Sequence, residues 1–412
     1  MTHPRAALAA AWLATRALML WLLTYRGWDV VGREVWQLYH HWYGVLAHGA
    51  FPVHDTLWQY PPGAGPLLLS PGLLPGLTYF QAFVALTLAA DAVVALALTR
   101  AGSRPGRTLL GATVWVGGLP LLLHLPLARY DVQVTALAVL SLLASARSTR
   151  VCGTLAALGA LVKVWPVLLL TGLPKGRATR SAWTAAAVTG TTSLALLCTL
   201  FDHPFAFLRQ QGGRGVQIES FGGTALALAR HAGWPGKVRY QYGALEYTGP
   251  YVPTVAHVSL ALSAVSLGLL LLWRVRARLW GEATPYDTAL SAVLLFTVTS
   301  RVISPQYMIW LLGLAAVCLT SRHTTQRPVA ALVVAATAVS TLVYPVLYDE
   351  VMDATWTGVA LMLVRNGLLG AAAVLSFTRV WRSTVIPPKS HMSPGSRAAT
   401  PVAPAGPARL VH

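Results

Sequence analysis

Apolar residues occur along this sequence in runs long enough to cross a membrane, from residue 6 to residue 378. The runs show no ten-residue alternation of apolar and polar positions, which argues against a β-barrel. Because lipid offers no partner to backbone N–H and C=O groups, each run is expected to be a helix. The predicted spans are residues 6–25, 79–99, 108–125, 131–146, 152–163, 166–174, 183–201, 254–273, 287–300, 305–320, 328–345 and 355–378. This pattern predicts an all-α polytopic membrane protein with about 12 transmembrane segments.

The composition agrees with a membrane location. Hydrophobic residues make up 55% of the 412-residue chain and charged residues only 11%, whereas soluble domains carry about 25% charged residues. The net charge of +18 would suit nucleic acid, but the cations alternate with the apolar runs and indicate topology instead. The three cysteines form no CxxC pair, and the histidines lack zinc-ligand spacing, so neither a disulfide framework nor a zinc site is predicted.

The basic connections between spans predict the topology. Placing them in the cytoplasm leaves both termini inside and two long segments, about 26–78 and 202–253, outside a plasma membrane. Ten of the 13 acidic residues then lie on the outer side. Since acidic residues contribute little to topology, their concentration there points to an extracytoplasmic active site.

Two predicted spans, 152–163 and 166–174, are much shorter than the roughly 20 residues of a standard span. Pro166 breaks the helix between them. We therefore expect a short hairpin that rises from the cytoplasm and returns, with Lys163 and Trp165 at its tip. A lysine at such a depth is costly and is by default a functional candidate, although it could also snorkel to water.

Other segments are predicted from their pattern or composition. Residues 34–48 place apolar side chains at helical spacing and suit an interfacial helix, while the proline-rich run 62–76 suits a short re-entrant or interfacial piece. Residues 1–386 are expected to form one membrane domain, and 387–412, rich in Pro, Ser and Ala, a disordered cytoplasmic tail.

Charged residues inside spans are expected to pair. Arg16, Asp91 and Arg365 lie within apolar runs. Asp91 could pair with either arginine, and a fixed ion pair of this kind would lock helix packing.

Three carboxylates of the first outer segment, those of Asp29, Glu34 and Asp55, are candidates for a general base. They would suit an amphiphilic substrate at the membrane surface. The alternative is that they solvate a loop and favour a helix N-terminus.

Cations near the outer surface are candidates for holding a phosphate. They are Arg129, Lys163, Arg214 and Arg301. Arg129 lies two residues before Asp131, so a local ion pair is the alternative there. Further candidates for substrate contact are polar or aromatic residues of the outer segments: Trp42, Trp58, Gln59, Tyr60, Asp131, Gln217, Glu219, Gln306 and Tyr307. Trp58 and Tyr60 could equally form an aromatic belt at headgroup level.

Several stretches occur in a characteristic order: "DVVGREVWQLYHHWYGVLAHGAFPVHDTLWQYPPG", "RYD", "GALVKVWPVLLL", "RGVQIES" and "RVISPQYMIW". Together they resemble glycosyltransferase family 87 of the GT-C superfamily, over about residues 5 to 385. The resemblance implies a GT-C-like bundle, a polyprenyl-phosphate sugar donor, usually of mannose, and inversion at the anomeric carbon. It also implies a catalytic aspartate in the first outer loop. Asp29 best matches that position, and Glu34 competes because the spacing to "YHHW" is longer than in many relatives.

The predicted function is therefore transfer of a hexose from a polyprenyl-phosphate donor to a lipid or glycan acceptor in cell-envelope glycolipid synthesis. Mannose is the favoured hexose. Membrane lipids are expected partners, and nucleic acid is not. No cofactor is firmly implied, although the outer carboxylates could bind Mg²⁺ or Mn²⁺ at a lipid phosphate. The alternative function is a transporter or flippase for a lipid-linked glycan precursor, which the charges inside spans would favour.

Overall fold

The computed structural model describes residues 3–25 and 29–385 and is mostly helical. Within these residues, six helices have the length and apolar composition needed to cross a membrane. They are α1 (His3–Thr24), α5 (Tyr79–Gly102), α9 (Arg177–Leu200), α12 (Val252–Arg276), α15 (Arg327–Thr341) with its continuation η7 (Leu342–Val346), and α17 (Trp356–Thr384). The predicted membrane protein is confirmed at this level. The predicted tail, 387–412, lies outside the described residues.

The number of about 12 spans is not confirmed, because the other apolar runs form shorter helices. These are α6 (Leu110–Gly118) with η4 (Leu119–Leu122), η5 (Leu125–Ala128), α7 (Asp131–Ser145), α8 (Thr149–Val162), η6 (Trp165–Gly172), α13 (Thr284–Thr299) and α14 (Tyr307–Leu319). Helix α14 is buried along almost its whole length and packs against α6, α7 and α15. The short helices thus form the centre of the bundle, and long helices such as α12 leave apolar side chains exposed on its outside.

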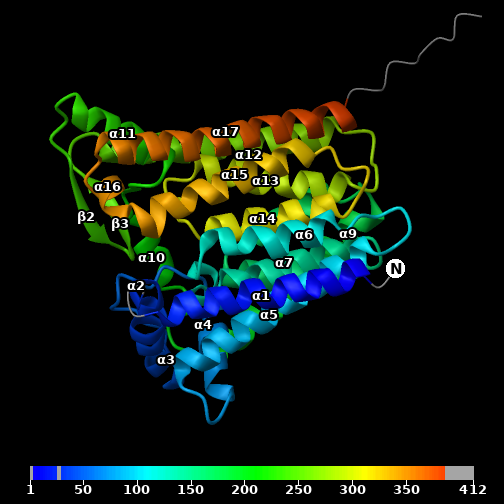
Figure 1. Ribbon diagram of the computed structural model, residues 1–412, viewed down its shortest axis with the longest axis horizontal. Helices are drawn as coiled ribbons and strands as arrows, with labels where there is room; N and C mark the ends of the chain where they lie inside the picture. Colours follow the sequence, from blue (N-terminus) through cyan, green and yellow to red (C-terminus); the bar gives the residue numbers. More distant parts are fainter. Residues whose placement is uncertain (1–2, 26–28, 386–412) are drawn as a thin grey trace, which may run out of the picture.

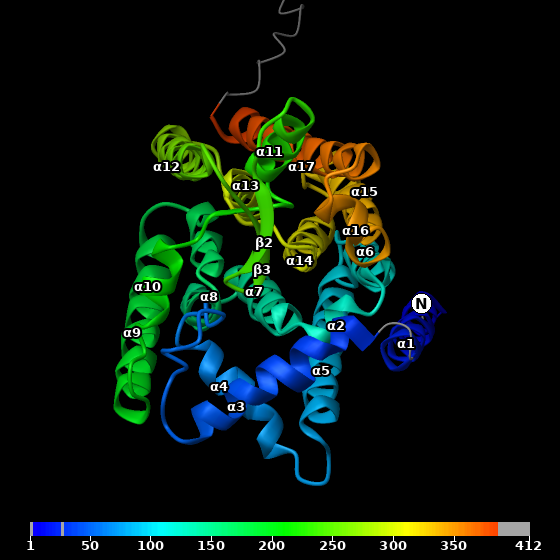
Figure 2. The ribbon, with the colours of Figure 1, turned by 90° about the vertical axis from the view of Figure 1, so that its left-hand side faces the viewer.

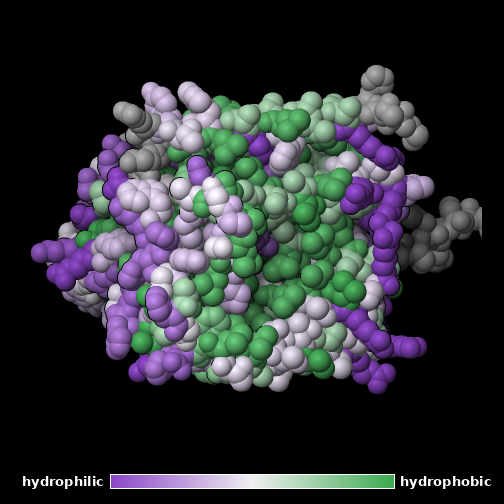
Figure 3. Space-filling model, turned by 90° about the horizontal axis from the view of Figure 1, so that it is seen from below, coloured by the Kyte–Doolittle hydropathy of each residue, from purple (hydrophilic) through white to green (hydrophobic). Residues whose placement is uncertain are grey.

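The bundle has a hydrophobic belt between two hydrophilic ends (Figure 3). One end, at the right of Figure 1, carries the start of α1, the end of α17 and the α5–α6 connection. At this end Arg107 forms an ion pair with Glu282, and Lys175 donates to the carbonyl of Ala277 at 2.8 Å. These contacts bring the basic connections around Arg107, Lys175 and Arg278 to the same end of the molecule. That this side faces the cytoplasm stays a prediction.

The first outer segment lies at the opposite end. It contains α2 (Asp29–Arg33), the π-helix η2 (Glu34–Tyr39), α3 (His40–Ala47), α4 (Ala64–Leu69) and η3 (Ser70–Leu73). The predicted helix over 34–48 is present as η2 and α3, and it buries Val35, Trp42 and Leu46. The run 62–76 forms two short helices and no span, as its prolines predict.

The second outer segment corrects the all-α expectation. Besides α10 (Phe207–Gly212) and α11 (Phe221–His231), it forms three strands: β1 (Val216–Gln217), β2 (Lys237–Gln241) and β3 (Ala244–Thr248). They pair antiparallel in the order β1–β3–β2. Tyr242 and Gly243 form the turn of the β2–β3 hairpin with positive φ of 52° and 76°, which is typical of two-residue hairpin loops. In Figure 2 the hairpin lies between the blue helices α2 to α4 and the orange α16 (Tyr348–Met352) and α17.

The charges inside spans are paired. Arg16 forms a buried ion pair of 2.7 Å with Asp91. The same carboxylate accepts hydrogen bonds of 2.7 Å from the indole nitrogens of Trp12 and Trp115. Asp91 thereby joins α1, α5 and α6 and has a donor for each oxygen, which buried charge requires.

Candidate functional site

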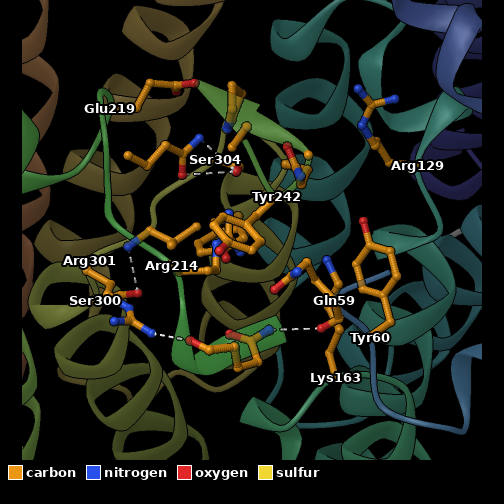
Figure 4. A pocket seen from close by; sticks show the side chains of 18 of the residues that line it. Gln59, Tyr60, Arg129, Lys163, Arg214, Glu219, Tyr242, Ser300, Arg301 and Ser304 are labelled. Carbon is orange, nitrogen blue, oxygen red and sulfur yellow. Dashed lines mark hydrogen bonds between the residues drawn. The ribbon is translucent and has the colours of Figure 1, made fainter. Parts of the chain in front are cut away.

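A cavity of about 750 Å³ lies at the end of the molecule that carries the hairpin. Its walls come from parts of the chain that are far apart in sequence. They are the first outer segment, the tip of the α8–η6 hairpin, the second outer segment, the α13–α14 connection and the region around η7 and α16. Figure 4 shows Gln59, Tyr60 and Lys163 on one side of this cavity and Arg301 on the other.

Lys163 stands at the break between α8 and η6, as the proline after it predicts. Its ammonium group pairs with Asp131 Oδ1 at 2.6 Å, and the indole nitrogen of Trp310 donates to the same oxygen at 2.6 Å. The ammonium also lies 4.8 Å from the ring centre of Tyr130 and 5.0 Å from that of Trp310. A carboxylate and aromatic faces thus hold this cation at the edge of the cavity, where it does not snorkel freely.

Arg214 and Arg301 face the cavity from the second outer segment and the α13–α14 connection. Arg214 donates to Glu246 of β3 at 3.0 Å. Arg301 donates to the carbonyl of Gln211 at 2.6 Å, and within the described residues it forms no ion pair. Burial lowers the pKa of Arg301, and the neighbouring Arg214 lowers it further. An anion placed between these two guanidinium groups would relieve both effects.

Among the carboxylates of the first outer segment whose side chains are described, Glu34 lines the cavity and Asp55 does not. Arg129 binds Glu34 Oε2 at 2.6 Å, and the hydroxyl of Tyr39 donates to Oε1 at 2.9 Å. Arg129 is itself fixed by the carbonyls of Val31 and Ala128. These contacts orient the Glu34 carboxylate while leaving 26% of its side chain exposed.

Glu219 is a second carboxylate in the cavity wall, and it is almost fully buried. Arg365 of α17 lies 3.5 Å from its Oε2 and donates to its backbone carbonyl at 2.7 Å. Burial raises the pKa of Glu219 to about 7, and Arg365 only partly offsets this effect. Arg365 therefore pairs with Glu219 and not with Asp91.

Aromatic rings form much of the remaining wall. Trp165 stacks on Trp310 with ring centres 5.2 Å apart, and Tyr307 also stacks on Trp310, with ring centres 3.9 Å apart. Tyr60 contacts Tyr130 edge-on at 5.2 Å. Flat apolar faces beside hydrogen-bonding groups suit a sugar ring or an isoprenoid chain.

Most predicted site residues meet in this cavity. Those that line it are Glu34, Gln59, Tyr60, Arg129, Lys163, Arg214, Gln217, Glu219, Arg301, Gln306 and Tyr307. The suggested local pair of Arg129 and Asp131 is not formed, because Arg129 turns to Glu34 and Asp131 to Lys163.

Asp55, Trp42, Trp58 and Asp131 do not line the cavity. Asp55 accepts from the Trp42 indole at 2.7 Å and from the backbone N–H of Leu57 at 2.8 Å, and Trp58 packs edge-on against Trp42. These residues support the wall from behind. Asp29 is the first residue of α2, but its side chain lies outside the described part of the structure.

Some lining residues were not predicted. Tyr240 and Tyr242 of the hairpin, Gln211 of α10, and Tyr344 and Tyr348 near α16 all face the cavity. The tyrosines around the "QYG" turn could have been found as a hairpin signal, since a two-residue turn containing Gly joins two β-prone runs. Gln211 carries no such signal.

The arrangement can bind an anionic group beside an apolar surface and bring a carboxylate to the bound substrate. Lys163 and Arg301 lie on opposite sides of the cavity (Figure 4), and Glu34 is also among its lining residues. Among the described residues, no group of three or more His, Cys, Asp or Glu side chains could hold a metal ion.

Comparison with known proteins supports this interpretation. The family model of glycosyltransferase family 87 matches residues 58–305, more than half of the chain. The match begins after Asp29, Glu34 and Asp55, so it says nothing of these residues. A comparison with curated proteins gives no match. The matched region includes the α8–η6 tip, the hairpin and most of the cavity wall, and the chain belongs to glycosyltransferase family 87.

Proposed function

We propose that this membrane glycosyltransferase transfers a hexose, with mannose as the first sugar to test, from a polyprenyl-phosphate donor to a hydroxyl group of a lipid or glycan acceptor. The reaction would take place on the extracytoplasmic face and invert the anomeric carbon. The observation that carries the proposal is Arg301. It is a half-buried cation without an ion-pair partner among the described residues, and it faces Lys163 and Arg214 in one cavity.

The cations supply the part of the site that a sugar phosphate needs. When the bond between the anomeric carbon and the phosphate oxygen breaks, the polyprenyl phosphate leaves with increased negative charge. Arg301, Arg214 and Lys163 line the same cavity and would stabilise this charge, because cations aimed at the charge that develops in the transition state lower the barrier. The leaving group then needs no protonation.

The base has three candidates in the first outer segment. The acceptor oxygen forms a bond to the anomeric carbon, and its proton passes to a carboxylate. The resemblance places this role on Asp29, whereas the cavity wall contains Glu34. The two residues begin consecutive helices, α2 and η2, so both belong to the same part of the first outer segment. Asp55 is the weaker third candidate, because Trp42 and Leu57 already occupy its oxygens.

The membrane position of the cavity supports a lipid-borne donor. The residues that line the cavity come from loops and helix ends at the hairpin end of the molecule, and Figure 3 shows a hydrophobic belt next to each hydrophilic end. A polyprenyl chain could remain in lipid while its phosphate and sugar reach Lys163, Tyr307 and Trp310.

The direct test is transfer by the purified protein. Radiolabelled polyprenyl-phosphate-mannose and a membrane lipid extract are the substrates, and the labelled product is identified by mass spectrometry. We expect a new glycosidic product with inverted configuration. Movement of intact donor across reconstituted vesicles without a new bond would instead identify a flippase.

Variants separate the candidate bases. Asp29→Asn, Glu34→Gln and Asp55→Asn are compared at equal amounts of folded protein. Loss of the base is expected to lower kcat at least about 100-fold, because general-base catalysis contributes about 10² to 10⁴. Full transfer by all three variants would refute a base in this segment. Transfer that survives EDTA would agree with a mechanism without a divalent metal.

A further inference from the structure

A second cavity lies at the opposite end of the molecule, outside the site described above. Its volume is about 380 Å³, within the range of about 300 to 1,000 Å³ that is usual for ligand pockets. It is formed by the ends of α5 and α7, the start of α8, and residues of the α5–α6 connection and α13. This end carries the basic connections at the right of Figures 1 and 3.

Four arginines line this second cavity: Arg100, Arg104, Arg107 and Arg147. Arg107 is paired with Glu282, and its guanidinium lies 6.0 Å from the ring centre of Tyr286. Within the described residues the other three arginines form no ion pair, so three positive charges remain uncompensated around one cavity.

The remaining wall suits the region where a lipid headgroup meets its acyl chains. Ala97, Leu143 and Val151 line the cavity beside the arginines, and Val151 is 47% exposed on the outside of the bundle. Ser148 caps the N-terminus of α8 at the cavity, which adds the positive end of a helix dipole. Basic recesses between transmembrane helices are typical places for anionic lipid headgroups.

The ordinary explanation of these arginines is topology, since positive residues accumulate on the cytoplasmic side. It explains their number at this end but not their convergence. Arg177, Arg180 and Arg278 lie in the basic segments of the same end and are exposed, as Arg100, Arg104 and Arg147 are, but they do not line this second cavity. The convergence of Arg100, Arg104 and Arg147 on a recess with an aliphatic wall therefore needs a second reason.

We propose that this second cavity binds the phosphate group of an anionic membrane phospholipid, with Arg100, Arg104 and Arg147 as its ligands and the aliphatic wall against the start of the acyl chains. The site is separate from the catalytic cavity. The proposal does not depend on the donor or on the base.

Native mass spectrometry of the purified full-length protein tests the proposal. The probes are dioleoyl-phosphatidylglycerol and, for comparison, dioleoyl-phosphatidylcholine. We expect one phosphatidylglycerol molecule to be retained with clear preference. In the variant Arg104→Gln/Arg147→Gln, its affinity should fall at least about tenfold, because each basic residue near an anionic lipid surface contributes substantially to binding.

The matched control is Arg180→Gln/Arg278→Gln, which removes the same charge from the same end. It should keep the wild-type affinity. Equal loss in both variants would overturn the proposal, because it would show only general attraction of lipid to a basic surface. Equal retention in both would overturn it as well.

A third variant guards against misfolding. Ala97→Phe fills the aliphatic part of the cavity and keeps every arginine, and it should also weaken phosphatidylglycerol binding. Inorganic phosphate is the final arm. If it displaces phosphatidylglycerol at equal molar concentration, the site recognises a free phosphate and the lipid assignment is wrong.

Discussion

The ammonium group of Lys163 and the carboxylate of Asp131 lie 2.6 Å apart, although α7 and the α8–η6 tip supply them separately. The pair has two functions that experiment can separate. Asp131 needs a cation because it is almost fully buried, and under the proposed function the cavity would need a positive charge facing the donor. Removing the lysine alone therefore disturbs both stability and binding.

We predict that Lys163→Met lowers stability by about 3 kcal/mol and raises the apparent donor KM more than the acceptor KM. The double variant Lys163→Met/Asp131→Asn should regain most of the stability, because no buried charge is left alone. It should not regain donor affinity. Thermal unfolding and initial rates at varied donor concentration measure both effects. Recovery of donor affinity in the double variant would show that Lys163 does not bind the donor.

Arg214 and Arg301 should differ in the same kind of experiment. Arg214→Gln leaves Glu246 buried without its cation, so this variant should lose stability as well as donor affinity. Arg301→Gln leaves no carboxylate unpaired and should raise the donor KM about tenfold or more with little change in Tm. The comparison needs donor titrations and thermal unfolding of both variants. A donor KM that is normal in Arg301→Gln would contradict the proposed phosphate site.

The buried Glu219 predicts a pH dependence of stability. Its pKa is raised to about 7 from an ordinary value of 4.5, so the folded protein holds its proton more tightly than the unfolded chain does. The resulting stabilisation is complete below about pH 4.5 and is lost as the pH rises through about 7. Wild-type protein should therefore lose Tm relative to Glu219→Gln between pH 5.5 and pH 8.5. Asp349→Asn, at an exposed position of the same end, is the control and should follow the wild type.

Gly63 tests how the first outer segment is held against the Lys163 tip. Its backbone N–H donates to the carbonyl of Leu161 at 2.9 Å, and a Cβ at this position would lie 2.6 Å from that same carbonyl. Gly63→Ala should therefore push the "YPPG" turn away from α8, with a loss of about 1 to 3 kcal/mol and of activity. Gly44→Ala is the control, because an added Cβ there meets no atom within 4 Å. Equal activity of the two variants would mean that the close approach at Gly63 does not position the site.

The sequence predicted the positions of helices and turns better than it predicted which charged residues pair with each other. Lys163 could be placed at a hairpin tip, because two short apolar runs meet at Pro166 between basic clusters. Its pairing with Asp131 could not be deduced, since the two residues are 32 positions apart and belong to different helices. The same limit applies to Arg365. Its pairing with Glu219 joins segments 146 residues apart, whereas the sequence offered Asp91 as an equally reasonable partner.

The short strands of the second outer segment were also not predicted from the sequence. The strands of the second outer segment have two to five residues each, too few for an alternating pattern to dominate a chain rich in apolar runs. Arg301, Lys163 and Arg214 could still be grouped in advance, because topology alone places their loops on one face. To group the three cations, it was enough to know on which side of the membrane each loop lies. To predict the sheet, the pairing of individual residues between its strands would have been required.

The short length of α8 bears on how deep in the membrane Lys163 would lie. Its 14 residues rise at most about 21 Å from the basic end, less than the roughly 30 Å of a hydrocarbon layer, before the chain turns back at Lys163. The ammonium group would then stand several ångströms beneath the level of neighbouring lipid headgroups. A phosphate that meets it there must be drawn down from the surface, and the long isoprenoid tail behind it must bend or slide sideways between helices. The length of α8 would thus place Lys163 at a depth that a sugar phosphate on a flexible lipid carrier can reach more easily than a sugar phosphate arriving from water.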